Sequence, residues 1–220
     1  MANLEKVKSI EQQSKDLVFG FVRSEESLVS HCVIPTLVIH FCLLYWYEAE
    51  RFDEEHRYSD YKLSMHHTLL SKAESSNRGC VYLTKVAYRG VHSWTFQIVQ
   101  MDTSRFTISI GVYKYPQYER DTSLPIRADK FAGRAYGWIV SGRRKFRGDS
   151  DELQTWAPCA CKEGDVVSMI LDLHKFELRF KVNDTSYGAA YQHIENTSYL
   201  AAVSCYRVGD AVKFISYTAD

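Results

Sequence analysis

The sequence predicts an all-β chain that folds as a two-sheet antiparallel sandwich of the jelly-roll type, with a short helical extension at its N-terminus. Apolar and polar residues alternate with a period of two in several segments after residue 80, as in strands with one buried face. Turn-forming residues separate these segments, and no helical pattern lies between them. This combination favours a sandwich over a fold with crossover helices.

The predicted strands differ in how clearly they alternate. The clearest alternation is in 94–98, 106–110 and 177–182. Segment 166–173 is more continuously apolar, which is typical of a strand deep in a sandwich. Segments 199–205 and 211–217 complete the set, and turn signals lie at 89–90, 162–165, 182–184 and 208–210.

The chain of 220 residues is expected to have four parts: a polar tail (1–16), a helical extension (17–56), an irregular linker (57–79) and the sandwich (80–218). The extension contains an apolar run at 33–47, and a membrane-spanning helix needs roughly 20 apolar residues. No membrane span is therefore predicted. The helix expected at 34–47 either packs on the sandwich or contacts another chain, including a second copy.

Charge and cysteine content limit the function classes. Lys plus Arg and Asp plus Glu both number 27, so the net charge is zero and no nucleic-acid partner is predicted. A basic cluster at 143–147 is followed by acidic residues at 149–152, and we interpret it as a solvated hairpin loop. Residues 1–16 lack an apolar signal-like run, so a cytoplasmic location is expected, with the six cysteines reduced and mostly buried.

Cys159 and Cys161 are candidate metal ligands together with His66, His67 or Cys205. Structural zinc sites normally contain a second matching pair of cysteines, and the sequence has none. In a strand, positions 159 and 161 would share a face and pack as small apolar groups. No metal or other cofactor is predicted.

A series of short motifs occurs in a fixed order after residue 80. They lie at 94–98 (WTFQI), 109–112 (SIGV), 136–138 (YGW), 162–167 (KEGDVV), 171–173 (LDL), 177–183 (ELRFKVN), 188–191 (GAAY) and 199–204 (YLAAVS). Their order and spacing resemble those of the SPRY domain family over residues 80–218. The resemblance implies a bent, concanavalin-like sandwich that binds proteins or peptides through loops at one end.

Two further features follow from this resemblance. Several SPRY proteins are substrate-recognition parts of ubiquitin ligases, which implies an adaptor role with the ligase on a separate chain. The leader at 18–23 and the apolar segment 43–47 are similar to short helical leaders of protist SPRY and repeat proteins.

One position departs from the family pattern. The family usually places Gly after the Asn of a two-residue hairpin, because that position needs a positive φ. This chain has Asp184 after Asn183. Since Asp tolerates that conformation less well than Gly, a longer turn is expected here.

Eight residues are predicted to bind the partner: Tyr113, Lys114, Tyr115, Tyr118, Tyr206, Arg207, Asn77 and Arg78. The first four follow a predicted strand that ends at Val112, and tyrosines in a loop give large contact area at low entropic cost. Tyr206 and Arg207 lie in the last inter-strand loop, which the resemblance places on the same surface. The alternative is that these side chains cover the end of the sandwich or belong to solvated loops.

Enzymatic readings of the sequence are weaker. Asp165, Asp172 and Glu177 would lie in neighbouring strands, and glycosidases use two carboxylates about 5–10 Å apart. A carbohydrate-binding or glycan-active sandwich is therefore one alternative. Asp165 and Asp172 fall at turn positions, however, where they most simply accept backbone N–H bonds, so no enzyme is predicted. A structural subunit assembled through 17–56 is the other alternative.

Overall fold

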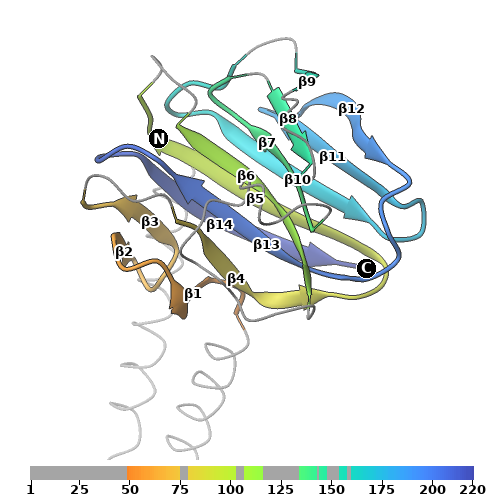
Figure 1. Cartoon of the computed structure of the whole chain (residues 1–220), viewed down its shortest axis with the longest axis horizontal. Coiled ribbons are helices and arrows are strands. Elements are labelled where there is room, and N and C mark those ends of the chain that lie inside the picture. The colour runs from red at the N-terminus through yellow and green to blue at the C-terminus, as the bar shows by residue number, and fades with distance from the viewer. Residues whose placement is uncertain are drawn as a thin grey trace, which may run out of the picture. The chain divides into compact units, whose positions relative to one another are not determined.

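A computed structural model describes residues 49–74, 79–102, 107–115, 134–142, 144–147, 154–157 and 160–220. These residues form two antiparallel sheets stacked as a sandwich (Figure 1), which confirms the predicted fold class. Over the same ranges no helix is long and apolar enough to cross a membrane. The polar tail, the leader and the helix expected at 34–47 lie outside the described residues.

Each sheet has seven strands. Sheet A runs β1 (Phe52–Arg57), β4 (Val81–Ala87), β13 (Ser198–Cys205), β6 (Ile108–Tyr115), β7 (Ala135–Ile139), β8 (Arg144–Arg147) and β9 (Gln154–Thr155). Sheet B runs β12 (Thr185–Gln192), β11 (Glu177–Val182), β10 (Val166–Asp172), β5 (Val91–Gln100), β14 (Ala211–Ala219), β3 (Leu69–Lys72) and β2 (Tyr61–Ser64).

The main core lies between the sheets and contains the predicted apolar positions. Trp94, Phe96 and Ile98 of β5 are fully buried, as the period-two pattern predicted. Trp138 of sheet A packs edge-to-face on Phe180 of sheet B, with ring centroids 5.7 Å apart. These aromatic contacts between the two sheets explain why the Trp and Phe positions dominate the sequence signature.

A second buried cluster lies on sheet A. Its members are Cys80, Tyr82, Tyr113, Ala135, Ile139, Phe146, Leu200 and Ala202. Neighbouring positions such as Val112 belong to the main core, and successive side chains of a strand point to opposite faces. The second cluster therefore occupies the face of sheet A that points away from sheet B.

The expected linker at 57–79 is wrong, because the sandwich begins earlier. Strands β2 and β3 lie within that segment, and β1 occupies the last part of the expected helical extension. Tyr61 and Leu70 are core residues, but β1 and β2 are edge strands with exposed polar side chains. Edge strands of this kind lack a clear apolar pattern, so they could not be predicted from the sequence.

The basic cluster expected in a solvated loop lies largely in a strand. Arg144–Arg147 forms β8, which pairs with β7 on one side and β9 on the other. Phe146 of this strand is buried in the second cluster. Because charged residues flank Phe146, the sequence pattern did not reveal that this apolar side chain anchors the strand.

The hairpin between β11 and β12 has a two-residue turn, so the longer turn expected there is wrong. Val182 pairs with Thr185, and Asn183 and Asp184 have φ values of 48° and 68°. The Asn183 side chain accepts a bond from Val166 N (2.9 Å) and donates one to Asp165 Oδ1 (2.9 Å). These bonds help to hold the left-handed conformation without glycine.

Replacing Asn183 tests this account of the turn. Asn183→Ala removes both side-chain bonds and leaves a left-handed alanine, so the free energy of unfolding should fall by about 2 kcal/mol. Asp184→Gly keeps the Asn183 bonds and relieves left-handed strain, so this control should be at least as stable as the wild type. Urea denaturation measures both, and an Asn183→Ala variant as stable as the wild type would contradict the account.

Candidate functional site

The predicted binding residues do not form one surface. In the pairing of β6 with β13, Tyr115 lies opposite Ser198 and Ile108 lies opposite Cys205. Tyr115 and Tyr206 are therefore at opposite ends of these strands, about 23 Å apart at 3.3 Å per residue. The expectation that the Tyr113–Tyr118 region and Tyr206-Arg207 share a surface is wrong for the residues that the structure describes.

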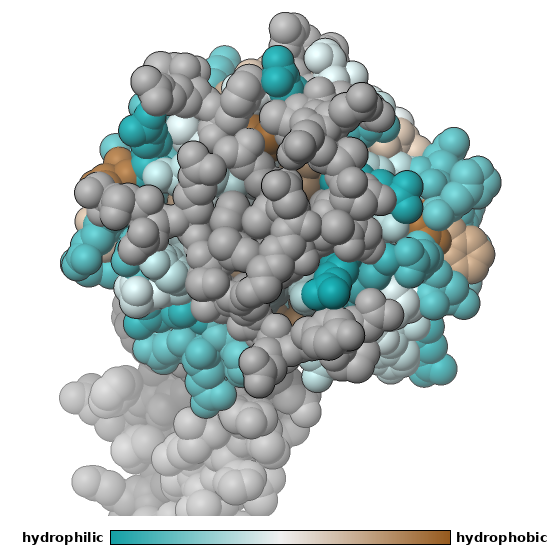
Figure 2. All heavy atoms as spheres, in the orientation of Figure 1, coloured by the Kyte–Doolittle hydropathy of each residue, from teal (hydrophilic) through white to brown (hydrophobic). Residues whose placement is uncertain are grey.

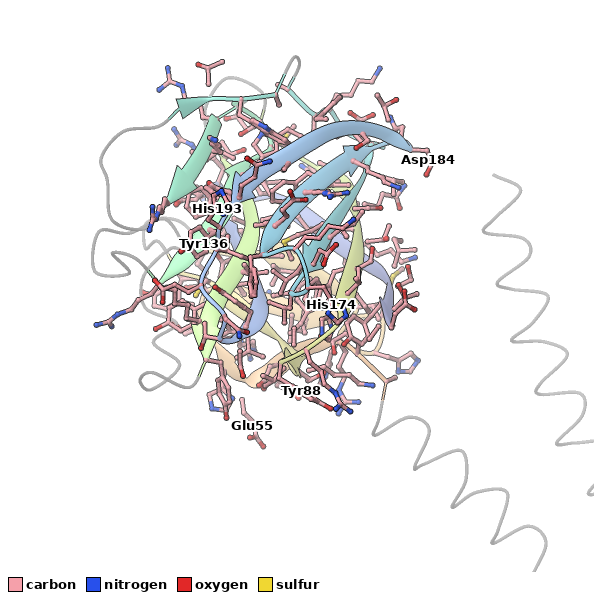
Figure 3. All side chains as sticks on the ribbon, turned by 90° about the vertical axis from the view of Figure 1, so that its right-hand side faces the viewer. Glu55, Tyr88, Tyr136, His174, Asp184 and His193 are labelled. Carbon is pink, nitrogen blue, oxygen red and sulfur yellow. The ribbon has the colours of Figure 1, made fainter. Side chains whose placement is uncertain are left out.

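We call these regions the Tyr115 end and the Tyr206 end. The Tyr206 end contains loop 206–210, residues 101 and 102, and the turn at Asn183 and Asp184. The Tyr115 end contains turns 88–90 and 173–176 and loop 193–197. In Figure 3, Asp184 lies at one end of the sandwich, whereas His174 and Tyr88 lie toward the other.

Three of the predicted residues lie in a strand and not in a loop. Strand β6 continues to Tyr115 instead of ending at Val112. Tyr113 is 2% exposed and belongs to the second buried cluster, and Lys114 is 4% exposed. The pairing of β6 with β13 over eight positions extends the strand into a segment whose tyrosines and proline resembled a loop. Tyr118, Asn77 and Arg78 lie outside the described residues.

At the Tyr206 end, one buried carboxylate organises two loops. Asp210 is 1% exposed and accepts backbone N–H bonds from Asp102 (3.1 Å), Tyr206 (3.3 Å) and Arg207 (2.9 Å). Burial raises the pKa of Asp210, while these three donors oppose the rise because they favour the charged form. The carboxylate therefore fixes loop 206–210 against the residues that follow β5.

A polar cluster lies beneath this loop. Lys72 Nζ pairs with Asp60 at 3.0 Å and lies 4.9 Å from the ring centre of Tyr61. The Tyr61 hydroxyl donates to Gly79 O (2.7 Å) and accepts from Cys205 N (2.9 Å). Strands β2, β3 and β13 are thereby tied together directly below the loop.

The anchored loop presents a small mixed surface. Arg207 is exposed and Val208 is 55% exposed, while Tyr206 is half-buried. The described surface in Figure 2 is mostly hydrophilic, with small apolar areas. The exposed large apolar side chains in the described ranges are Met65, Tyr88, Val99, Val208 and Ile215. Val208 is the member of this set that lies in loop 206–210.

Replacing Asp210 tests whether it organises the loops. Asp210→Ala leaves the N–H groups of Asp102 and Arg207 without this acceptor, so the free energy of unfolding should fall by about 2–4 kcal/mol. Hydrogen exchange at these two amides should become faster. Asp102→Asn is the matched control, because it keeps the backbone N–H that bonds to Asp210, and it should leave exchange at Arg207 unchanged. Unchanged amide exchange in Asp210→Ala would contradict the assignment.

The three carboxylates considered for a glycosidase all have structural partners. Asp165 accepts a bond from Lys162 N (2.9 Å), and Asp172 accepts bonds from His174 N and Lys175 N (3.0 and 2.9 Å). This confirms the predicted backbone-capping role of both residues. They flank the two ends of β10, about 23 Å apart, so they are not a carboxylate pair. Glu177 pairs with Arg179.

The cysteine expectations are tested only in part. Cys80, Cys161 and Cys205 are buried, as predicted for them. Across the ranges that the structure describes, no group of three or more His, Cys, Asp or Glu side chains could hold a metal ion. Cys159, Cys32 and Cys42 lie outside these ranges.

A buried acid, Glu50, was missed by the sequence analysis because it belongs to a charged run. It is 8% exposed, and its carboxylate accepts bonds from Lys85 N at 3.0 and 3.3 Å. Burial raises the pKa of Glu50 to about 8. Burial also raises the pKa of Tyr217 to about 12, and the nearby charge of Glu50 adds to that rise.

His92 contacts the same Tyr217 but is not arranged as a catalytic base. Its Nε2 atom is 2.7 Å from Arg89 O and donates to it, so Nδ1 accepts from the Tyr217 hydroxyl at 2.8 Å. Both ring nitrogens are therefore engaged, and burial lowers the pKa of His92. These two hydrogen bonds hold His92 in its neutral form, and its role is structural.

Glu50 should make stability depend on pH. A carboxyl group with a folded pKa of about 8 and an ordinary pKa of 4.5 contributes its full stability below pH 4.5 and loses it as pH rises to 8. Glu50→Gln should remove most of this slope and raise the free energy of unfolding at pH 8 by about 2–4 kcal/mol. Exposed Glu55→Gln is the control. Denaturant titrations from pH 4.5 to 9 would refute the assignment if Glu50→Gln kept the wild-type slope.

Comparisons with known proteins identify the fold. The chain is similar to the SPRY domain of human HERC1, with 17% identity, 75% of this chain and 97% of that chain covered, and a TM-score of 0.62. It is also similar to the PSpry domain of TRIM65 (17% identity, 81% and 99% covered, TM-score 0.58) and to a human SPRY domain (18% identity, 71% and 94% covered, TM-score 0.53). No family model matches the sequence, and no curated protein shows significant similarity to it. The described residues therefore have a SPRY-type fold.

Proposed function

We propose that the chain is a non-catalytic protein-interaction module that binds a peptide or a protein surface through loop 206–210. The observation that carries this proposal is the Asp210 carboxylate, which accepts N–H bonds from Tyr206 and Arg207 of the loop and from Asp102 after β5. A loop fixed in this way loses little conformational entropy on binding. Arg207 and Val208 then offer a cation and an apolar contact at the surface.

The SPRY-type fold supports an interaction role, since function in such folds resides in loops on a rigid sandwich. More specifically, we propose that the chain acts in the cytoplasm as a substrate-recognition adaptor for a ubiquitin ligase. It requires the ligase to be recruited as a separate chain. Tyr118, Asn77 and Arg78 lie outside the described residues and remain predicted contacts.

Affinity capture from a native cell extract, read by mass spectrometry, tests the placement of the site. Arg207→Ala combined with Val208→Ala should lose specific partners that the wild type retains, because both exposed side chains are removed. The free energy of unfolding should change by no more than about 0.5 kcal/mol, since the backbone donors to Asp210 remain. Lys175→Ala, an exposed change in turn 173–176 at the Tyr115 end, is the matched control and should keep every partner.

Retention of all wild-type partners by the double variant would contradict the placement. Loss of the same partners in Lys175→Ala would also contradict it, because that residue lies at the opposite end of the sandwich. Ligase subunits among the partners that depend on Arg207 and Val208 would support the adaptor role.

A further inference from the structure

Loop 206–210, which joins β13 to β14, contains a type II β-turn over residues 207–210. The N–H of Asp210 donates to Arg207 O at 3.0 Å, and Gly209 at the third position of the turn has a φ of 90°. A type II turn requires a positive φ at its third position, which glycine adopts without strain. Val208 therefore occupies the second position, at the apex of the turn.

The turn is fixed to its neighbours through backbone bonds. Gly209 N–H donates to Lys72 O (3.0 Å), and Lys72 N–H donates to Asp210 O (2.9 Å), so β3 holds the turn from one side. A Cβ atom added at Gly209 would lie 3.1 Å from Gln100 Nε2, so the turn also lies against the end of β5. Together with the bonds to the Asp210 carboxylate, these contacts hold one conformation of the turn before any partner binds.

The apex of this turn presents three groups that have no partner within the described part of the chain. The first is the side chain of Val208, which is 55% exposed. The second is the Val208 N–H, because the other four N–H groups of loop 206–210 donate hydrogen bonds and this one does not. The third is the guanidinium group of the exposed Arg207, which has no ion pair in the described ranges.

The charges around the turn favour one carboxylate, and not a polyanion, as the partner of Arg207. Three exposed acids lie at the same end of the sandwich, Asp102, Glu163 and Asp184, together with the exposed Lys162. A surface of mixed sign does not attract polyanions. A guanidinium group without an ion pair of its own can still hold one carboxylate through two parallel bonds. No acidic residue occurs in the adjoining segments that the structure leaves undescribed: 75–78, 103–106, 143 and 158–159.

The shape of the site decides which kind of partner fits it. A linear peptide is normally bound in a concave site that buries the peptide's own side chains. Here the exposed apolar side chain is that of Val208, and it stands at the apex of a convex turn. Its burial requires a pocket on the partner. A pocket of fixed shape is a property of a folded protein.

We propose that loop 206–210 is the inserted element of the complex: Val208 enters an apolar pocket on a folded partner protein, and a carboxylate at the rim of this pocket pairs with Arg207. A backbone carbonyl of the partner accepts the free N–H of Val208. The inference rests on the proposed function and narrows it, because it assigns the partner as a folded protein with an apolar pocket and excludes a linear peptide.

Isothermal titration calorimetry with the full chain tests this proposal. Each protein whose capture depends on Arg207 and Val208 is prepared as a folded protein and as a set of short overlapping peptides that cover its sequence. The folded protein should bind at least about tenfold more tightly than any of its peptides, because only the folded form has the pocket.

Variants at the apex test the chemistry of the pocket with the same folded protein. Val208→Ala removes two buried methyl groups and should weaken binding about tenfold. Val208→Thr keeps the shape of valine but brings a hydroxyl group into the pocket, so it should also weaken binding about tenfold. Arg207→Gln should weaken binding and reduce its dependence on salt. Lys175→Ala, at the opposite end, should bind like the wild type, and thermal denaturation checks that each variant is folded.

The outcomes separate this inference from the proposed function. A peptide that binds as tightly as the folded protein, and loses binding in Val208→Ala, would overturn the inserted turn and leave the proposed function standing. Equal affinity of Val208→Thr and the wild type for the folded protein would overturn the apolar pocket. A capture experiment in which no partner depends on Arg207 and Val208 would overturn the proposed function, and this inference with it.

Discussion

Strands β6 and β13 pair along eight consecutive positions near the centre of sheet A, from Tyr115 opposite Ser198 to Ile108 opposite Cys205. Because side chains alternate in a strand, a shift of one residue would exchange the main core with the second buried cluster. The burial of Val112 on one face and Tyr113 on the other therefore fixes the register. This register in turn decides which loops gather at each end of the sandwich.

The two ends use buried charges in different ways. Asp210 is satisfied by backbone donors of the loops it joins, so its role is to make a surface rigid. Lys114 is satisfied by the side chain of an exposed residue, Glu195. A buried charge paired with fixed backbone dipoles stabilises one conformation, whereas a pair closed by a surface side chain permits exchange. The proposed function of the Tyr206 end follows from the rigidity that Asp210 gives to its loop.

The sequence predicted the strands whose positions are set by the main core. The alternation of Trp94, Phe96 and Ile98 is enough to place β5, and the capping roles of Asp165 and Asp172 follow from their turn positions. Short edge strands such as β1 and β2 were not predictable, because exposed polar side chains obscure the alternation.

The candidate site was harder to predict because it depends on register. The sequence around Tyr115 and the sequence around Tyr206 both suggest a loop. Only the pairing of β6 with β13 shows that the two residues lie far apart. The role of Asp210 requires bonds between loops 108 positions apart in the chain, which no local motif encodes. Glu50 and Glu195 belong to polar segments. Their roles depend on buried groups of neighbouring strands, which the local sequence does not reveal.

The central claim is that the sandwich separates two surfaces that the sequence had suggested were one. Bio-orthogonal spin labels at positions 115 and 207, measured by pulsed electron resonance in the full chain, test it most directly. Seven steps of extended strand, about 23 Å, separate position 115 from the end of β13, and position 207 lies just beyond that end, so the predicted distance is about 25 Å. A distance below about 12 Å, less than half that strand length, would place both residues on one surface and contradict the account.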